Sequence, residues 1–537
     1  MKKLFSLLLV CAMALSLAAC GKSNDSTSDK TNEGDKPATE QTSTAKSPDN
    51  DLVVAVQTDA THLDPHVSSN GASNMITDPM YETLLTFDKD TNVVPALAKE
   101  WSVSEDGRTY TFVLNEGIKF HDGEPFNAEA VKAVYERGEA NPNLTLQRTT
   151  KSWEAVNVES EYVVSIVLEE PNNTFINKIT QLKMVSPKVM AMENASDYLS
   201  KNSAGTGPFV LSDRVDGGYT KMVPNENYWR EGSTVDSLTF MVVPEDGARL
   251  AMLQTGEADI VYPIPATDVS MIDSDPSIYV DIAPTTTYRY VTLNTEWQLP
   301  DGRKPFADKR VRQAMNYAFD SETYAKVVFN GYAKVPTSIF SDSIMYFSEQ
   351  APYTKDLEKA KSLMAEAGYE DGFDVELIVD NTSIEQKGAT FVMQQLSEIG
   401  INVKLLPNES TTNAELTSAP LEDTTVQMWY VNWSSGSYEA DGSMRPLLHS
   451  EKFPPSGYNT AFWKNEKFDQ LLDEALLMSN SDDIAAAYAE AQAIAWEECP
   501  WIFLGNDNGL QAWKTYVNGL QFKPGGVFVF TNVGLEH

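Results

Sequence analysis

The sequence predicts an α/β protein with more than one domain, and three observations support this prediction. The chain has 537 residues, which exceeds the size of one ordinary domain. Residues 93–206 show the alternating patterns of strands. Residues 300–500 instead combine short apolar runs with helical periodicity. Because hydrophobic residues make up 42% of the chain, it can bury a large core.

The first twenty residues have the features of an export signal. Two lysines precede an apolar run, residues 4–17, that is too short to span a bilayer. The run ends in Leu17-Ala18-Ala19-Cys20, which resembles a bacterial lipobox. This resemblance implies that residues 1–19 are a lipoprotein signal peptide and that Cys20 becomes a lipidated N-terminus. The alternative is an ordinary signal peptide in which Cys20 is incidental.

Residues 20–50 are expected to form a lipid-anchored, disordered tether. In residues 21–50 only Ala38 and Ala45 are clearly apolar, so this segment cannot build a core. As a flexible coil it would span roughly 30 Å. Beyond this segment the chain has one cysteine, Cys499, so we expect no intramolecular disulfide.

Strands are expected at the start of the body and through the strand-rich region. "DLVVAVQTD" begins the body, "RTYTFVLNEGIKF" alternates with period two and turns at an Asn-Glu-Gly sequence, and "YVVSIVLEEP" stops at a proline. A β-α-β unit follows later, in residues 374–406. Thr382 and Glu385 have the spacing of a capping box, and Gly400 is placed to end the helix. Further helices are expected in "DKRVRQAMNYAF", "DLEKAKSLMAEAG", "EKFDQLLDEALLM" and "DDIAAAYAEAQAIAWEE".

Charge and motifs exclude several functions. Lys plus Arg number 41 against 77 Asp plus Glu, a net charge of −36 that argues against binding nucleic acid or contacting a membrane through a basic surface. Motifs for a zinc protease, a serine hydrolase, a phosphate-binding loop or paired cysteines are absent from the sequence. The five histidines are scattered, so we expect no metal site, no cofactor and no enzymatic activity.

Several motifs resemble one family along essentially all of residues 51–537. They are "PALAKEWSVSEDGRTYTFVLNEGIKFHDGEPFNAEAV" (95–131), "GTGPF" (205–209), "MLQTGEADI" (252–260), "PFADKRVRQAMNYAFD" (305–320) and "KAKSLMAEAGY" (361–369). Together they resemble the family 5 solute-binding proteins of ABC importers, which bind peptides, nickel and related solutes. Asn115 stands where the family commonly has a basic residue. "YVNWSSGSYEAD" and "FPPSGYNTAFWKNEKFDQLLDEAL" are similar to the glutathione-binding members.

The resemblance implies a two-lobed periplasmic-binding-protein-like fold, of the large type II class with an extra subdomain. Lobe I would combine residues 51–92, 207–288 and 501–537. The inserted strand-rich subdomain would be 93–206, and lobe II would be 289–500. Ligand would close the lobes by a hinge, and the closed form would dock on a membrane permease.

The resemblance also suggests ligand contacts. Peptide-binding relatives receive the ligand's ammonium on an aspartate after an aromatic strand, and Asp441 stands there; the alternative is a loop carboxylate. Beside it, Trp433 would wall the cleft, with core packing as the alternative, and one of Tyr430 and Trp429 would join it, because these two neighbours point to opposite faces. Arg289 or Arg445 would meet a ligand carboxylate, although Arg289 could pair with a neighbouring acid and Arg445 with Glu439. Thr61 and His62 follow the first strand, where this fold places cleft loops.

The function implied is capture of a small peptide, glutathione or a di- or oligopeptide, for an ABC importer by a monomer anchored outside the cell membrane. Alternatives are a nickel-chelate or other non-peptide solute binder, a lipid-anchored hydrolase on the same fold, and a sensor for a membrane receptor.

Overall fold

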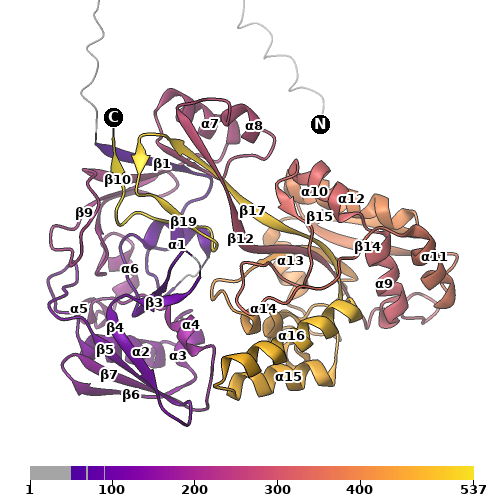
Figure 1. The fold of residues 1–537 in the computed structure, drawn as a ribbon, viewed down its shortest axis with the longest axis horizontal. Helices are drawn as coiled ribbons and strands as arrows, with labels where there is room; N and C mark the ends of the chain where they lie inside the picture. Colours follow the sequence, from indigo (N-terminus) through magenta and orange to yellow (C-terminus); the bar gives the residue numbers. More distant parts are fainter. Residues whose placement is uncertain (1–49, 68–69, 90, 537) are drawn as a thin grey trace, which may run out of the picture. The chain divides into compact units, whose positions relative to one another are not determined.

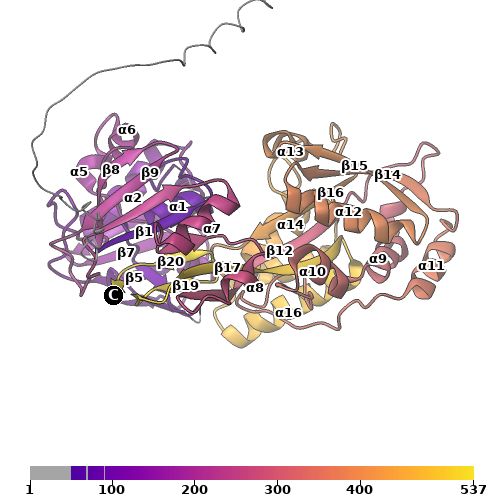
Figure 2. The ribbon, with the colours of Figure 1, turned by 90° about the horizontal axis from the view of Figure 1, so that it is seen from above.

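The computed structural model of the protein describes residues 50–67, 70–89 and 91–536. The predictions of a signal peptide, of lipidation at Cys20 and of a tether lie outside these residues, apart from Asn50 at the end of the tether. Within the described part, no helix has the length and apolar character needed to cross a membrane. Most of the elements named below are labelled in Figure 1, and β8, β16 and β20 are labelled in Figure 2.

Lobe I is built on a sheet in which β1 lies between two parallel neighbours, β10 and β11. The sheet continues through antiparallel β9 and β8. Its core joins apolar side chains of β1 and β10 to α1 and to the C-terminal segment. The bounds are β1 Asp51–Val56, α1 Gly71–Thr77, β2 Leu85–Phe87, β3 Val93–Pro95, β8 Phe209–Val215, β9 Tyr219–Pro224, β10 Ser237–Val242, α7 Asp246–Thr255, β11 Ile260–Tyr262, α8 Val269–Ile272, β18 Val517–Asn518, β19 Gln521–Lys523, β20 Val527–Val529 and β21 Gly534–Leu535.

The strand-rich region forms a separate antiparallel sheet of four strands in the order β4-β5-β7-β6. Inward side chains of β5 alternate with outward ones, as the period of two predicts, and they pack with α2. The bounds are β4 Ala98–Val103, β5 Thr109–Leu114, α2 Ala128–Ala140, α3 Gln147–Thr150, β6 Trp153–Ser160, β7 Val163–Leu168, α4 Phe175–Ile179, α5 Pro187–Met190 and α6 Ala195–Leu199.

Lobe II is a three-layered structure. Its sheet buries one face against α9–α12 and the other against α14–α16. The bounds are α9 Lys309–Ala318, α10 Ser321–Phe329, β13 Ala333–Lys334, α11 Leu357–Glu366, β14 Phe373–Asp380, α12 Ser383–Ser397, β15 Ile401–Asn408, α13 Ser410–Thr417, β16 Met428–Ser434, α14 Ala440–Leu448, α15 Glu466–Leu477 and α16 Ser481–Glu498; the short turns of 3₁₀ helix are Pro305–Ala307 and Ser450–Lys452.

The predicted β-α-β unit is confirmed: β14 and β15 are parallel and α12 connects them. The Thr382 side chain caps α12 by accepting from the Glu385 backbone N–H at 3.4 Å, and Gly400 has φ of +83° after the helix. The Glu385 side chain does not complete the capping box, because it pairs with Arg289 instead. Cys499 is a free, buried cysteine.

Two long strands, β12 (Ile278–Leu293) and β17 (Trp501–Lys514), pass through both lobes side by side (Figures 1 and 2). They join the two halves into one sheet of eleven strands. Their register shifts between Pro284 and Tyr288, which marks the crossover. We expected lobe I to resume at residue 501, but Trp501 and Phe503 pack in the core of lobe II with α14–α16. The chain therefore returns to lobe I only in the second half of β17.

Candidate ligand-binding site

The aromatic strand β16 sends alternate side chains to opposite faces of the lobe II sheet. Met428 and Tyr430 pack in the core beneath α9–α12, and the Tyr430 hydroxyl hydrogen-bonds to that of Tyr324. Val431 and Trp433 pack on the other face, toward α14–α16. This alternation is the ordinary consequence of extended backbone.

A pocket of about 300 Å³ lies beside β16, where the neighbouring β14 ends. The three predicted aromatic residues, Trp429, Tyr430 and Trp433, all contribute to its lining. The full lining is Tyr290, Asp380, Glu385, Trp429, Tyr430, Val431, Asn432, Trp433, Leu447 and Tyr458. The Trp433 and Tyr458 rings touch, with centroids 5.5 Å apart. In α/β sheets, the carboxyl ends of parallel strands are where ligands bind. We call this cavity the aromatic pocket.

The charged residues that line the aromatic pocket are both acidic. Asp380, the last residue of β14, accepts hydrogen bonds from Ser410 Oγ at 2.6 Å and Asn413 Nδ2 at 2.7 Å. Glu385, in the first turn of α12, pairs with Arg289 NH1 at 2.7 Å. No lysine or arginine is among the lining residues.

Arg289 lies buried at the crossover between the lobes, where it is held by two carboxylates. Its Nε reaches the Asp507 carboxylate at 2.8 and 2.9 Å, and its NH1 reaches Glu385. Its guanidinium also lies over the Phe329 ring, 5.0 Å from the centroid. Burial opposes the charged form, but the two acids outweigh it and raise the pKa of Arg289 above its ordinary value. The structure thus shows the pairing with neighbouring acids that we considered; a role in binding a ligand carboxylate stays a prediction.

Asp441 and Arg445 are brought together one turn apart on α14. Arg445 Nε donates to both oxygens of Asp441, at 2.9 and 3.1 Å, and NH1 reaches Asp473 at 2.6 Å. Arg445 therefore neutralises Asp441 rather than Glu439. Burial raises the pKa of Asp441 despite the opposing influence of Arg445. Neither Asp441 nor Arg445 lines the aromatic pocket, and their contact with ligand stays a prediction.

Glu439 caps the start of α14 and is only 3% exposed. Its Oε1 accepts from the Gly442 N–H at 2.9 Å and from Ser437 Oγ at 3.1 Å. Its Oε2 is buried and has no hydrogen-bond partner among the described residues. Burial, reinforced by the nearby Asp441 carboxylate, raises the pKa of Glu439 to about 7.

Thr61 and His62 lie in the loop after β1, and both are exposed. Thr61 Oγ1 accepts from Asn70 Nδ2 at 2.9 Å and lies 3.1 Å from Ser73 Oγ, which ties the loop to the start of α1. Neither Thr61 nor His62 lines the aromatic pocket or the second cavity described next. Their contact with ligand also stays a prediction.

A second cavity, of about 310 Å³, lies between lobe I and the loop after β16, and we call it the inter-lobe cavity. Gly436 and Tyr438 are the lining residues from lobe II. The Tyr438 ring packs at a tilt of 51° against Phe87, with centroids 4.5 Å apart, and its hydroxyl accepts from the Gly525 N–H at 2.7 Å. These contacts hold the two lobes together beside the cavity.

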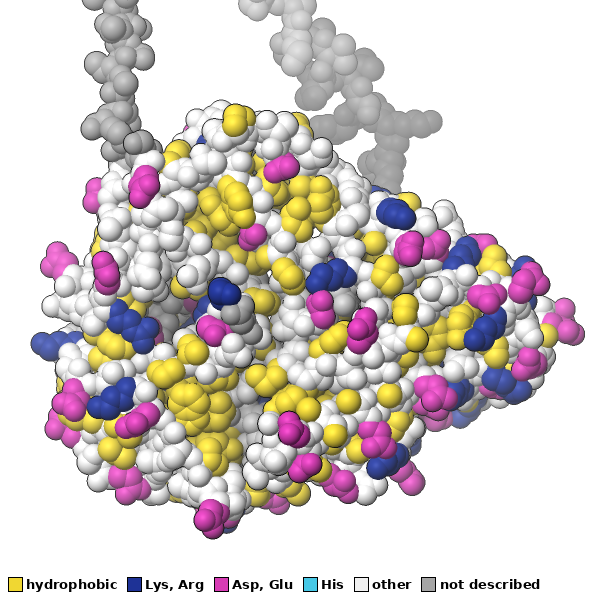
Figure 3. Space-filling view, in the orientation of Figure 1, with side chains coloured by type: hydrophobic (Ala, Val, Ile, Leu, Met, Phe, Trp, Pro, Cys, Tyr) yellow, Lys and Arg dark blue, Asp and Glu magenta, His cyan; other side chains and the backbone are white. Residues whose placement is uncertain are grey.

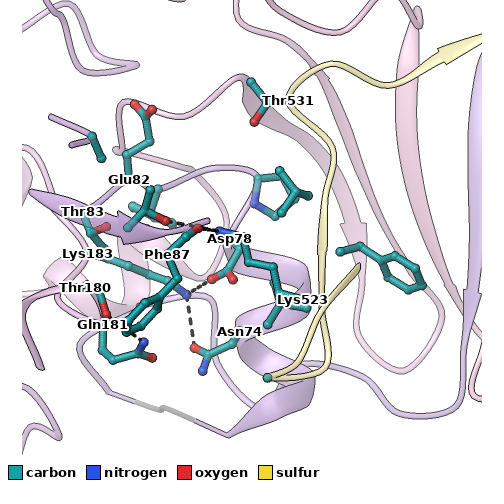
Figure 4. Close-up of a pocket in the computed structure, with 18 of the residues that line it drawn as sticks. Asn74, Asp78, Glu82, Thr83, Phe87, Thr180, Gln181, Lys183, Lys523 and Thr531 are labelled. Atoms are coloured by element: carbon teal, nitrogen blue, oxygen red, sulfur yellow. Dashed lines mark hydrogen bonds and ion pairs between the residues drawn. The ribbon is translucent and has the colours of Figure 1, made fainter. Parts of the chain in front are cut away.

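Basic side chains reach the inter-lobe cavity: Lys183 and Lys523, labelled in Figure 4, and Arg230. Lys183 Nζ pairs with Asp78 at 2.5 Å and donates to Asn74 at 3.2 Å. Lys523 Nζ donates to the Phe87 carbonyl at 2.6 Å, and burial lowers its pKa. On the face in Figure 3, basic and acidic side chains are scattered among each other rather than gathered by sign.

The sequence analysis missed the acidic and lobe I parts of these cavities. Asp380 could have been found, because it ends a predicted strand of a β-α-β unit, where ligand sites form. Lys183, Lys523 and Tyr438 carried no signal, since nothing in their local sequence shows that they meet across the lobes.

A two-lobed α/β fold with a largely apolar pocket at strand ends is the architecture of a protein that binds small solutes. Comparison with known proteins agrees. The chain belongs to the bacterial extracellular solute-binding proteins of family 5, whose profile matches residues 92–455. This confirms the family that the sequence motifs resemble.

Individual relatives cover nearly the whole chain. The glutathione-binding protein GsiB of Salmonella typhi is 34% identical over 493 residues, which are 90% of this chain and 94% of the relative. Among solved structures, the periplasmic binding protein DppA of Helicobacter pylori with the peptide STSA has a TM-score of 0.76 at 27% identity, covering 90% of this chain and 98% of that one. The dipeptide-binding protein of Pseudoalteromonas with Met-Leu has a TM-score of 0.77 at 25% identity, covering 90% and 100%. These relatives are all binding proteins by name, which supports a binding function rather than catalysis.

Proposed function

We propose that this protein captures a small peptide between its two lobes and delivers it to the membrane permease of an ABC importer. The observation that carries the proposal is the aromatic pocket, which lies at the carboxyl end of β14 within a two-lobed fold. Its volume is at the lower end for small-ligand sites, which suits a ligand of a few residues. Relatives that bind a dipeptide, a tetrapeptide and glutathione support the class of ligand.

Glutathione is the first candidate ligand, and di- and oligopeptides are the next. The support for glutathione is the 34% identity to GsiB along 90% of this chain. The alternative ligand is a nickel chelate or another non-peptide solute. Direct identification of the bound ligand would distinguish it from a peptide.

Trp429 and Trp433 are proposed to form the lobe II wall of the site, because they line the pocket. Tyr430 borders the same pocket, but its ring packs in the core beneath α9–α12. Asp441, Arg445 and Arg289 are proposed contacts as well, and each already holds an ion pair that a ligand would have to share or displace. Thr61 and His62 are proposed contacts from lobe I, at its exposed loop after β1.

The protein is proposed to work as a monomer on the outer face of the cell membrane, anchored by lipid on Cys20. The support is the family, which is extracellular by description, and the lipobox-like end of the apolar N-terminal run. A tether of thirty polar residues would let the lobes reach the permease without contacting the lipid surface.

The experiment that tests the proposed function is mass spectrometry of ligand co-purified with the native protein, followed by calorimetry with glutathione and with di- and tripeptides. A retained, unmodified peptide that rebinds after removal supports peptide capture. Recovery of a metal chelate, or cleavage of an added peptide, would contradict it in favour of the non-peptide binder or the hydrolase. A sensor would be indicated if the purified protein binds the peptide but cells that lack its gene still take the peptide up.

A further inference from the structure

The inter-lobe cavity collects the positive charge that the aromatic pocket lacks. Its lining includes three basic residues, Lys183, Lys523 and Arg230, and two acidic ones, Asp78 and Glu82. The chain as a whole has a net charge of −36, so an excess of basic side chains in one cavity runs against its composition. A cavity lined in this way attracts an anionic group more strongly than a cationic one.

Both acidic residues of the cavity are already engaged. Asp78 pairs with Lys183 at 2.5 Å. Glu82 accepts hydrogen bonds from three neutral donors, which are Thr206 Oγ1 at 2.8 Å, Tyr228 OH at 3.0 Å and Trp229 Nε1 at 2.9 Å. The lysine at the end of β19, Lys523, therefore receives no carboxylate from the lining of the cavity.

Lys523 is half-buried and is held by neutral oxygens. Its Nζ donates to the Phe87 carbonyl at 2.6 Å and to Thr86 Oγ1 at 3.3 Å, and it forms no ion pair with a carboxylate in the described part of the chain. Burial lowers the pKa of Lys523, and the more distant Asp78 and Asp88 oppose this only in part. An ammonium group has three donors, so Lys523 can take one more acceptor. A charge withdrawn from water without a partner is costly, and a bound anion would remove that cost.

The surroundings of Lys523 belong to the contact between the lobes. Phe87, whose carbonyl accepts from Lys523, packs its ring against Tyr438 of lobe II. The Tyr438 hydroxyl in turn accepts from the N–H of Gly525, which follows Lys523 in the turn between β19 and β20. An anion on Lys523 would therefore lie beside the contacts that hold the two lobes together.

We infer that the inter-lobe cavity binds a carboxylate of the ligand, and that Lys523, from the C-terminal hairpin of lobe I, is the cationic partner of this carboxylate. The inference rests on the proposed function for the identity of the ligand as a peptide. It makes Lys523 a specificity-determining residue that favours peptides with more carboxylates than ammonium groups. Glutathione, with two carboxylates and one ammonium, belongs to this class.

The first test uses small probes and assumes no peptide ligand. Protein labelled with 3-fluorotyrosine is titrated with sodium propionate or with propionamide at constant ionic strength, and the Tyr438 fluorine resonance is followed after assignment with Tyr438→Phe. Because Tyr438 lines the cavity, propionate should shift its resonance saturably and the neutral amide should not. Equal shifts with both probes, or no shift with propionate, would overturn the inference. Tighter binding of inorganic phosphate than of propionate would overturn it in favour of a phosphorylated ligand.

The second test uses ligands that differ only in charge. Glutathione is compared by calorimetry with its two monoamides, in each of which one carboxylate is replaced by a carboxamide. At least one monoamide should bind about ten- to a hundredfold more weakly, the usual worth of a hydrogen bond to a charged group.

Each other outcome of this comparison is decisive. If both monoamides bind within about threefold of glutathione, the carboxylate site is wrong while peptide capture stands. Binding of tri-alanine but not of glutathione would contradict the preference for acidic peptides. Absence of binding by glutathione and by tri-alanine, together with a propionate response, would instead contradict peptide capture and support the cavity.

The third test changes Lys523. Lys523→Gln keeps an N–H for the Phe87 carbonyl but removes the charge, so it should abolish the difference in affinity between glutathione and the weaker monoamide. Lys523→Arg keeps the charge and should retain that difference. The matched control is Lys221→Gln on β9 of the same lobe, which lies 3.9 Å from Asp51 and lines neither cavity, and it should bind as the wild type does.

A folded Lys523→Gln that still distinguishes the carboxylate from the amide would refute the role of Lys523. If neither variant of Lys523 folds, the propionate and monoamide comparisons on wild-type protein still decide whether the cavity binds a carboxylate.

Discussion

Replacing Glu439 by Gln should stabilise the protein much more at pH 8 than at pH 5. Glu439 is buried, one of its oxygens has no partner in the described part of the chain, and its pKa is raised from 4.5 to about 7. In the folded protein the group thus keeps its proton up to about pH 7, whereas the unfolded chain releases it near 4.5. Since the folded state binds more protons in this interval, stability falls as pH rises through it.

The magnitude follows from the interval between the two pKa values. At about 1.4 kcal/mol for each pH unit, the ionised form of Glu439 costs the folded state roughly 3 kcal/mol above pH 7. Part of this cost is already present at pH 5, because Glu439 is about three-quarters ionised in the unfolded chain there. The stability advantage of Glu439→Gln should therefore grow by about 2–3 kcal/mol between pH 5 and pH 8.

Gln is a suitable replacement because its amide oxygen can still accept from the Gly442 N–H and Ser437 Oγ. Scanning calorimetry of ligand-free protein at both pH values would measure the effect. With an unfolding entropy of about 2 cal/mol/K per residue, a body of this size should gain roughly 2–3 °C more at pH 8 than at pH 5.

The matched control is Glu409→Gln. Glu409 also precedes a helix, α13, but it is exposed and its side chain makes no capping hydrogen bond. Its effect should be small and the same at both pH values. If the Glu439→Gln advantage is equal at pH 5 and pH 8, Glu439 does not hold a proton in the folded state and the reasoning from its burial is wrong.

Three further predictions concern ligand binding, anchoring and metal. Asp441→Asn should lower affinity for a free-amine peptide by about one and a half to three and a half decades in calorimetry, because its buried carboxylate is a proposed ligand contact; a change of less than threefold would show that Asp441 serves only its ion pair with Arg445. In the native host, Cys20→Ser should move the protein from the membrane fraction to the medium or to uncleaved precursor, and a mature protein that still incorporates labelled lipid would refute the lipobox assignment. Dialysis against a chelator should leave both folding and peptide binding unchanged, since the described residues contain no group of three or more His, Cys, Asp or Glu able to hold a metal; stoichiometric nickel or zinc by elemental analysis after dialysis would contradict this.

Much of the fold could be predicted because its signals are local. Periodicity of two identified β5, an apolar run stopped by a proline identified β7, and apolar spacing identified α9, α11, α15 and α16, each within a few residues of its observed bounds. The capping function of Thr382 depends on a residue three positions along the chain, so it too was readable. The family followed from motifs spread along nearly the whole chain, which no single local pattern could provide.

The site was only partly predictable. Trp429, Tyr430 and Trp433 of β16, which the sequence singled out, are among the residues that line a pocket, and their contact with ligand stays a prediction. The polar partners were harder. Arg445 and Asp441 are one helical turn apart, and their pairing would have been expected had this segment been read as a helix rather than as a loop.

The sequence by itself determined the α/β class, the order of strands and helices in lobe II, the family and the acidic character of the chain. The tertiary structure alone decided which charges meet. Arg289 finds Glu385 and Asp507 at separations of 96 and 218 residues, and these pairings arise only when β12, α12 and β17 are packed together. Asp380 has no basic partner in the described part of the chain for the same reason, since the side chains it contacts, Ser410 and Asn413, lie on α13 and are polar but uncharged. Hydrophobic periodicity specifies each helix or strand because it depends on residues that are close in sequence. The net charge of a pocket depends on side chains from several segments, and these become neighbours only after folding.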